Sequence, residues 1–166
     1  LAVSPTGEIV YYDGDSFTYD FNKPFVLYAK WEAKTNNVFF DKNGATSIGS
    51  ASKSCTIYNT NTSCSVTSPS ITRSGWTIVG WDTSSSSTSS SWSVNGSKSI
   101  SSNVTYYAVT KKAITATFDK NGATSVGSSS LSCDVYNTNT SCNITAPSIT
   151  RSGWTIVGWN TSSSGT

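Results

Sequence analysis

Two stretches of the chain, residues 40–88 and 118–166, align without gaps at an offset of 78 residues. Of the 49 aligned positions, 39 are identical, and most differences exchange one small or β-branched residue for another. A period of 78 residues is too long for one turn of a solenoid, whose repeats are about 20–45 residues long. Each repeat should therefore fold as a small domain around a core of its own.

The sequence outside the aligned stretches extends this organisation to three units. Residues 25–31 (Phe-Val-Leu-Tyr-Ala-Lys-Trp) are similar to residues 104–110 (Val-Thr-Tyr-Tyr-Ala-Val-Thr), which close the middle copy. We expect residues 1–35 to be the C-terminal half of a preceding repeat, residues 36–113 a complete repeat, and residues 114–166 the N-terminal part of a following repeat. The two ends then either belong to a longer array or complete each other between molecules by a donated strand.

The periodic segments of the chain predict strands. Residues 76–81 and 104–107 are dominated by β-branched and aromatic side chains, and the runs at 38–40 and 114–118 end near Asn-Gly, the dipeptide favoured in tight turns. No window has the apolar spacing of an amphipathic helix. Helix should therefore be short or missing, and the best place for a single turn is near residues 69–75, where Pro can open it and Gly can end it. The predicted fold class is mostly β (α+β at most), with little or no helix.

The four cysteines occur as two equivalent pairs, Cys55 with Cys64 and Cys133 with Cys142. Each pair brackets a Tyr-Asn-Thr-Asn-Thr-Ser segment, which we expect to form the tip of a hairpin with the two Cys on adjacent strands. Three pairings of four cysteines exist, and the duplication favours one local disulfide in each repeat. Disulfides imply an oxidising, extracytoplasmic compartment.

Composition excludes several classes of function. The chain has no His, so His-based catalytic triads and His-ligated metals are absent, and two Cys per repeat do not complete a metal site. Charged residues make up 12% of the chain and the net charge is +2, which does not indicate nucleic acid as a partner. No apolar run is long enough to span a membrane. We therefore expect no catalytic residues, no metal and no cofactor.

Few polar residues suggest chemistry. Asp41 and Asp119 precede Lys-Asn-Gly turns, where a carboxylate commonly accepts backbone N–H bonds. Arg73 and Arg151 precede Ser-Gly-Trp and are expected to stack on a Trp face. The recurring tryptophans are expected mainly in the cores, with one of each Trp pair nearer the surface. The recurring tryptophans are Trp76, Trp81, Trp154 and Trp159.

Three sequence blocks together resemble a known family. They are Phe-Asp-x-Asn-Gly, Pro-x-x-x-Arg-x-Gly-Trp-x-Ile-x-Gly-Trp, and Leu-Tyr-Ala-x-Trp. This pattern is similar to the Listeria–Bacteroides repeat, or internalin-type B-repeat. The family positions are Phe40, Gly44, Arg73, Gly75, Trp76, Gly80, Trp81 and their equivalents 78 residues later, with Tyr28, Ala29 and Trp31 in the closing strand. The chain departs from the family at Ala45 and Ala123, at Thr110 in place of the closing Trp, and in its Cys-bracketed segments.

The resemblance implies small β-grasp-like modules in tandem, as found in bacterial surface and secreted proteins, with no family active site. We expect a non-enzymatic extracellular segment of a surface or fibre protein that acts as a stalk, spacer or adhesin scaffold, with neighbouring repeats as its partners. Two alternatives stay open. One is a module that binds host or cell-surface glycans through exposed Trp and polar loops, with unknown ligand-binding residues. The other is a fibre subunit in which identical chains complete each other by strand donation.

Overall fold

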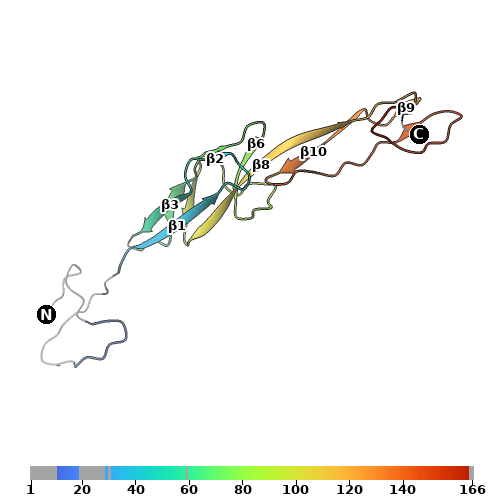
Figure 1. The fold of residues 1–166 in the computed structure, drawn as a ribbon. Coiled ribbons are helices and arrows are strands. Elements are labelled where there is room, and N and C mark those ends of the chain that lie inside the picture. Colours follow the sequence, from blue (N-terminus) through green and yellow to red (C-terminus); the bar gives the residue numbers. More distant parts are fainter. Residues whose placement is uncertain (1–10, 19–28, 30, 59, 165–166) are drawn as a thin grey trace.

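The computed structural model describes residues 11–18, 29, 31–58 and 60–164 of the chain (Figure 1). We call residues 34–110 the first unit and residues 111–164 the second unit. The described residues form eleven strands and contain no helix. The strands are β1 (Lys34–Asp41), β2 (Ser47–Ile48), β3 (Ser52–Ile57), β4 (Cys64–Thr67), β5 (Ile71–Thr72), β6 (Thr77–Asp82), β7 (Ser97–Ile100), β8 (Val104–Thr117), β9 (Ser125–Val126), β10 (Ser130–Tyr136) and β11 (Ile149–Thr150).

The 14-residue strand β8 belongs to both units. Its first residues pair in parallel with β1, its middle pairs antiparallel with β6, and its last seven residues pair antiparallel with β10. Tyr107 pairs with both β1 and β6, and Lys111 pairs with both β6 and β10. Strands β1 and β10 therefore follow one another along one edge of β8, and β6 lies on the other edge. The closing strand of the first unit continues directly into the opening strand of the second (Figure 1).

The core of the first unit lies between the sheet of β1, β3, β6 and β8 and a second layer that includes the β4–β7 pair. Alternate residues of β1 face inward, as expected for a half-buried strand, and these include Val38 and Phe40. The Phe40 ring packs edge-on against Trp81, with their centroids 4.9 Å apart, and Trp81 is fully buried. The remaining core residues are Ala45, Val66, Ile71, Trp92, Ile100, Tyr106 and Ala108.

A disulfide joins the two layers of the first unit. Cys55 lies on β3, which pairs with β1, and Cys64 lies on β4, which pairs with β7. The expected hairpin between the two Cys is therefore wrong, because β3 and β4 do not share a ladder. Strand β4 instead finds its partner in β7, and the bridge runs between sheets. A second disulfide, Cys133–Cys142, links β10 to the irregular segment that follows it.

The second unit repeats only the part of the first for which strand partners are present. Strands β8 and β10 pair in the same register as β1 and β3, and β9 pairs with β11 as β2 pairs with β5. Residues 154–159 have the same sequence as residues 76–81, yet they are irregular where 77–82 form β6. Strand β6 has β8 as its partner, and no described residue offers residues 154–159 an equivalent strand. Identical sequences therefore differ because a strand needs a ladder partner.

No helical turn forms near residues 69–75, the best place that the sequence offers for one. Ile71 and Thr72 form β5 instead, which pairs with β2, and a turn follows with Gly75 at φ +72°. The mostly β fold class is confirmed. The β-grasp-like arrangement stays a prediction, as do the domain boundaries. Most of residues 1–35 lies outside the described residues, including all of the expected closing strand at 25–31 except Ala29 and Trp31, which are not in a strand.

Candidate functional site: the junction between the units

The junction is closed by Asn137, the residue that follows β10. Its backbone N–H donates to the carbonyl oxygen of Thr110 on β8 (2.9 Å), and its side-chain Oδ1 accepts from the N–H of Thr110 (3.1 Å). Asn137 adopts a φ of +54°, a left-handed conformation that Asn tolerates better than most residues. Both residues are buried, Thr110 completely. After β10 the chain thus returns to β8, the strand through which it entered the second unit.

The carboxamide of Asn137 also holds the serine-rich loop of the first unit. Its Nδ2 donates to the carbonyl oxygens of Ser85 (3.1 Å) and Ser87 (2.9 Å). The carbonyl of Ser85 accepts a further bond from Nδ2 of Asn43 (2.7 Å), which also donates to the carbonyl of Ala108 (3.0 Å). Two asparagines, one from each unit, therefore fix this loop to β8.

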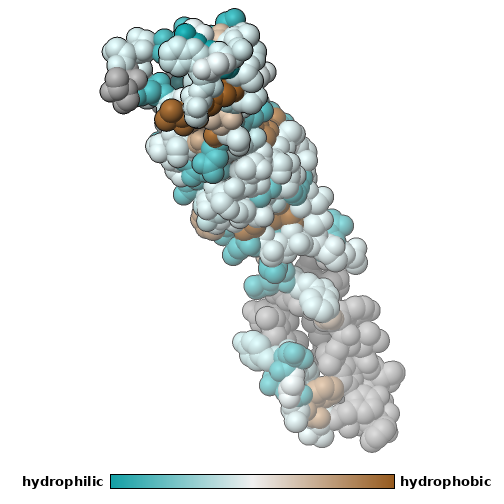
Figure 2. Space-filling view, turned by 90° about the vertical axis from the view of Figure 1, so that its right-hand side faces the viewer, coloured by the Kyte–Doolittle hydropathy of each residue, from teal (hydrophilic) through white to brown (hydrophobic). Residues whose placement is uncertain are grey.

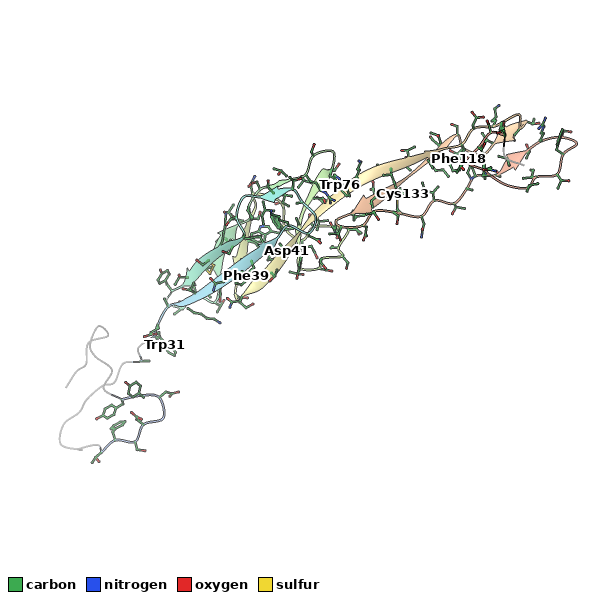
Figure 3. The ribbon with its side chains drawn as sticks, in the orientation of Figure 1. Trp31, Phe39, Asp41, Trp76, Phe118 and Cys133 are labelled. Carbon is green, nitrogen blue, oxygen red and sulfur yellow. A yellow bond between two sulfur atoms is a disulfide. The ribbon has the colours of Figure 1, made fainter. Side chains whose placement is uncertain are left out.

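Arg73 completes the junction from the side of the first unit. Its guanidinium stacks on the Trp76 ring at 3.3 Å from the centroid (Figure 3 labels Trp76). The same group donates to Oγ1 of Thr110 (2.7 Å) and to the carbonyl oxygen of Asn137 (2.5 Å). Partial burial lowers the pKa of Arg73 from its ordinary value, through desolvation of the charged form. Hydrogen bonds from a charged donor contribute more than neutral ones, so Arg73 is a main stabilising contact of the junction.

Gly44 provides the space in which these groups meet. A Cβ atom at this position would lie 3.1 Å from the carbonyl oxygen of Asn137 and 3.2 Å from Nη1 of Arg73. Gly44 also has a φ of +89°, which side-chain-bearing residues rarely adopt. Two independent constraints therefore require glycine where the turn after β1 meets the second unit.

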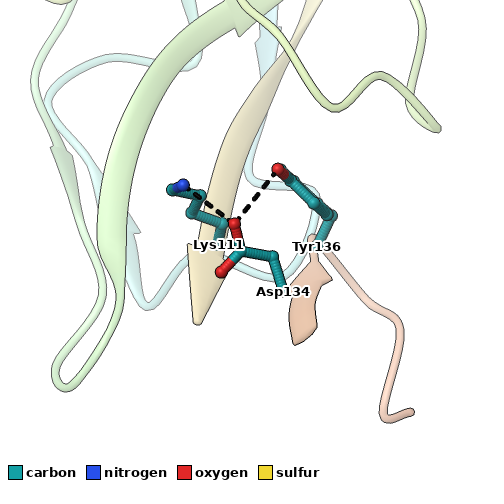
Figure 4. Close-up of polar contacts among 3 residues, drawn as sticks. All are labelled: Lys111, Asp134 and Tyr136. Carbon is teal, nitrogen blue, oxygen red and sulfur yellow. Dashed lines mark hydrogen bonds and ion pairs between the residues drawn. The ribbon is translucent and has the colours of Figure 1, made fainter. Parts of the chain in front are cut away.

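A polar cluster lies beside the junction on the β8–β10 ladder. The Nζ of Lys111 and the hydroxyl of Tyr136 both converge on Oδ2 of Asp134, at 2.9 Å and 3.5 Å (Figure 4). The hydrogen bond from Lys111 to Asp134 and the charge of this carboxylate raise the pKa of Lys111. The pair is more than a third exposed, so its contribution to stability is small. It distinguishes the second unit from the first, where Thr56 occupies the position of Asp134.

The sequence located part of this site. The expected stacking of Arg73 and Arg151 on tryptophan is confirmed, the second at 4.1 Å from the Trp154 centroid. The turn role of Asp41 and Asp119 is also confirmed, since each accepts an N–H bond from the residue two positions on, at 2.7 Å.

Asn137 and Thr110 were not identified from the sequence. Asn137 lies in a block of seven residues that is identical in both repeats, so nothing distinguished it from its neighbours. Thr110 did carry a signal, because it departs from the family's closing Trp. A small hydroxyl residue there leaves space for the Arg73 guanidinium and for Asn137 to approach β8.

The described residues contain no group of three or more His, Cys, Asp or Glu side chains that could hold a metal ion. Within the same part of the chain, no helix has the length and hydropathy required to cross a membrane. The main polar interactions at the junction are hydrogen bonds between the units. The hydrogen-bonding groups of the junction therefore bind one another and join the two units.

Repeated β units that share a strand and carry the same turn residues at equivalent positions define a tandem β-repeat protein. The family model of the Listeria-Bacteroides repeat domain matches residues 37–109 and 115–166. The chain belongs to this family, whose members are generally structural, non-catalytic and typical of bacterial surface proteins. No curated protein and no solved structure matches the chain.

Proposed function

We propose that this chain is a non-enzymatic segment of an extracellular bacterial surface protein and acts as a stiff stalk or spacer. The observation that carries the proposal is the junction. A flexible linker would leave each unit free to turn, whereas here β8 runs through both units and Asn137 ties the second unit back to the first. Two structural disulfides fit an oxidising location outside the cytoplasm.

The direction of the load also fits a stalk. A tandem chain under tension enters the first unit at the start of β1 and leaves it through the end of β8. These two strands are parallel neighbours, with Val38 to Asp41 paired to Val104 to Tyr107. Pulling their opposite ends therefore shears the ladder, so that its hydrogen bonds must break together rather than one after another. Shear geometry resists force better than peeling.

Single-molecule stretching of the chain by its ends tests this function. We expect the first unit to unfold in one step at a force well above that needed to extend an unstructured chain. The Cys55–Cys64 bridge should shorten the released length, and a reducing agent should restore it. Extension without a discrete unfolding step would contradict a load-bearing role.

The tryptophans of the two Arg–Trp stacks give little support to the glycan-binding alternative. Trp76 is half-buried under the Arg73 guanidinium, so one face of its ring is already occupied. Trp154, its equivalent, is 65% exposed, but its Arg151 stacks on it in the same way.

A further inference from the structure

We propose that Asn95 is a site of spontaneous chemical modification, where the carboxamide converts to a carboxylate through a cyclic imide formed with the backbone nitrogen of Gly96. This goes beyond the stalk function, since a stalk can bear load without changing over time. Asparagine is one of the thermolabile residues. A following glycine leaves the peptide nitrogen unhindered, because glycine has no Cβ atom.

The reaction begins when the nitrogen of Gly96 attacks Cγ of Asn95. A C–N bond forms, and the side-chain nitrogen leaves as ammonia with the proton that the attacking nitrogen gives up. Water then opens the resulting five-membered ring at either of its two carbonyl carbons. One product is aspartate with the original main chain. The other is isoaspartate, in which the main chain runs through Cβ and Cγ and gains one methylene.

The first unit contains two Asn-Gly dipeptides, which begin at Asn43 and Asn95. The Nδ2 atom of Asn43 donates to the carbonyl oxygens of Ser85 (2.7 Å) and Ala108 (3.0 Å). Asn95 is exposed, and its carboxamide forms no hydrogen bond with any residue that the structure describes. The carboxamide of Asn95 can therefore rotate toward the next nitrogen without losing a hydrogen bond, whereas that of Asn43 must first leave two acceptors.

The turn around Asn95 leaves both reactants accessible. The N–H of Gly96 donates to the carbonyl oxygen of Ser93 at 3.2 Å, the long end of the range for such bonds, so a small opening of the turn frees the attacking nitrogen. Most of the surface shown in Figure 2 is hydrophilic or neutral. Because Asn95 is itself exposed, water reaches the imide that forms there.

The same turn holds a tryptophan of the core. The carbonyl oxygen of Gly96 accepts from Nε1 of Trp92 (2.9 Å) and from the N–H of Ser68 (2.9 Å). Ser68 is 1% exposed, and its hydroxyl donates to the carbonyl oxygen of Ser93 (2.7 Å). Trp92 packs edge-on against Tyr106, with their centroids 4.9 Å apart. The main chain on both sides of residue 95 therefore fixes a buried serine and a core indole.

Isoaspartate at position 95 lengthens this main chain between its two fixed points. The added methylene lies between the carbonyls of Ser93 and Gly96, which Ser68 binds at the same time. The two carbonyls then cannot both keep their positions. Aspartate keeps the original main chain and adds only an exposed negative charge. We therefore expect the isoaspartate form to loosen Ser68 and Trp92, and the aspartate form to leave them in place.

Peptide mapping of the incubated protein tests the site. Trypsin cleaves after Lys and Arg, so peptides 43–53 and 74–98 each contain one asparagine and no cysteine. The folded chain is kept at mildly alkaline pH, and the mass gain from replacing an amino group by a hydroxyl is followed in each peptide. Conversion in peptide 74–98 should be faster by about 5-fold or more, because Asn43 must break its hydrogen bonds first.

The unfolded chain is the control for the local sequence. In denaturant the two peptides should convert at similar rates, because both dipeptides are Asn-Gly and neither fold nor hydrogen bonds protect them. Equal rates in the folded chain, or faster conversion at Asn43, would overturn the proposal. The same preference for Asn95 in folded and unfolded chains would also overturn it, since the fold would then have no part in selecting the site.

Amide hydrogen exchange at Ser68 tests the effect on the turn. The isolated isoaspartate form should exchange this hydrogen about 5-fold or more faster than the fresh chain, and freshly prepared Asn95→Asp should exchange it at the wild-type rate. Asn95→Gly keeps the φ of +57° accessible without a carboxamide, so it should stay unmodified and keep its exchange rate through the same incubation. An unchanged rate in the isoaspartate form, or an equal rise in incubated N95G, would contradict the proposal.

Discussion

Thr110 and Asn137 exchange two hydrogen bonds across the junction although they lie 27 positions apart in the sequence. The chain passes from one unit to the next through β8 and then returns to the same strand through this pair. The second unit is thereby held at two places, once covalently and once by hydrogen bonds. Bending the molecule about β8 would break the returning contact and expose buried polar groups, which opposes rotation of the units.

Asn137→Ala should loosen the junction without unfolding the first unit. The change removes the acceptor of the Thr110 N–H and the Nδ2 group that donates both hydrogen bonds to the serine-rich loop. Leaving a buried N–H unpaired costs about 1–3 kcal/mol. Amide hydrogen exchange at Thr110 should therefore quicken by about 5- to 150-fold. Asn139→Ala is the control, because its carboxamide has no bond to the first unit; equal exchange in the two variants would contradict this role.

Gly44→Ala should be more damaging than Gly122→Ala. Both glycines have similar positive φ values, +89° and +83°, so the backbone strain of adding a side chain is common to the two substitutions. Only at Gly44 does the new Cβ meet Asn137 and Arg73; at Gly122 the nearest atom is 3.5 Å away. Exchange of the Asn137 amide should rise in G44A and stay near the wild-type rate in G122A. The reverse order would show that Gly44 serves the turn alone.

Asn36→Ile should stabilise the first unit. Asn36 is 1% exposed on the core face of β1, and neither polar atom of its carboxamide has a partner among the described residues. The second unit has Ile114 at the same position. Removing an unsatisfied buried amide should raise the free energy of unfolding by about 1–3 kcal/mol. Chemical denaturation measures this free energy, and a loss of stability would contradict a net cost of burying this carboxamide.

Removing the Cys55–Cys64 bridge should destabilise the first unit as a whole. The bridge closes a segment of nine positions and links the two layers around the core, so Cys55→Ala/Cys64→Ala should lower the free energy of unfolding by about 2–4 kcal/mol. The Cys133–Cys142 bridge lies beyond the first unit. The double variant C133A/C142A should therefore leave the main denaturation midpoint nearly unchanged. An equal loss of unfolding free energy in both double variants would contradict the conclusion that only the Cys55–Cys64 bridge stabilises the first unit.

Asp82→Asn should weaken the first unit at neutral pH and have no effect in acid. Desolvation raises the pKa of Asp82, but hydrogen bonds from Ser84, Ser91 and Ser87 outweigh it and lower the pKa below 3.8. A lowered folded-state pKa gives stability that is present above the unfolded value and is lost as pH falls through the folded value. The difference between wild type and D82N should shrink below pH 3.8. A difference that does not shrink as the pH falls would rule out this carboxylate as its source.

The sequence was sufficient to predict much of the fold, because the same strand and turn patterns recur in both repeats. The β-branched and aromatic runs at 76–81 and 104–107 predicted strands that form β6 and the start of β8, and Asn43-Gly44 located a turn with two positive φ values. The sequence was insufficient wherever the pairing partner of a segment decides which ladder that segment joins. Cys55 and Cys64 are close in sequence, which favoured a hairpin, but β4 pairs with the distant β7.

The junction was harder to predict because its residues are not special within one repeat. Asn59 and Asn137 have the same neighbours on both sides, so local sequence alone cannot identify a contact with an adjacent unit. Arg73 was assigned to Trp76 correctly, but its two oxygen acceptors come from β8 and from the second unit. A contact between units depends on how β8 continues, which is a property of the assembled sheet.

Residual dipolar couplings of the backbone amides test the stiff junction most directly. If the shared strand and the Asn137 contacts hold the units as one body, couplings from residues 34–110 and from the β8–β10 ladder will fit a single alignment tensor. In Asn137→Ala the couplings of the ladder should become smaller relative to those of the first unit. Two different tensors in the wild-type chain would contradict the account, because they would show that the units turn independently.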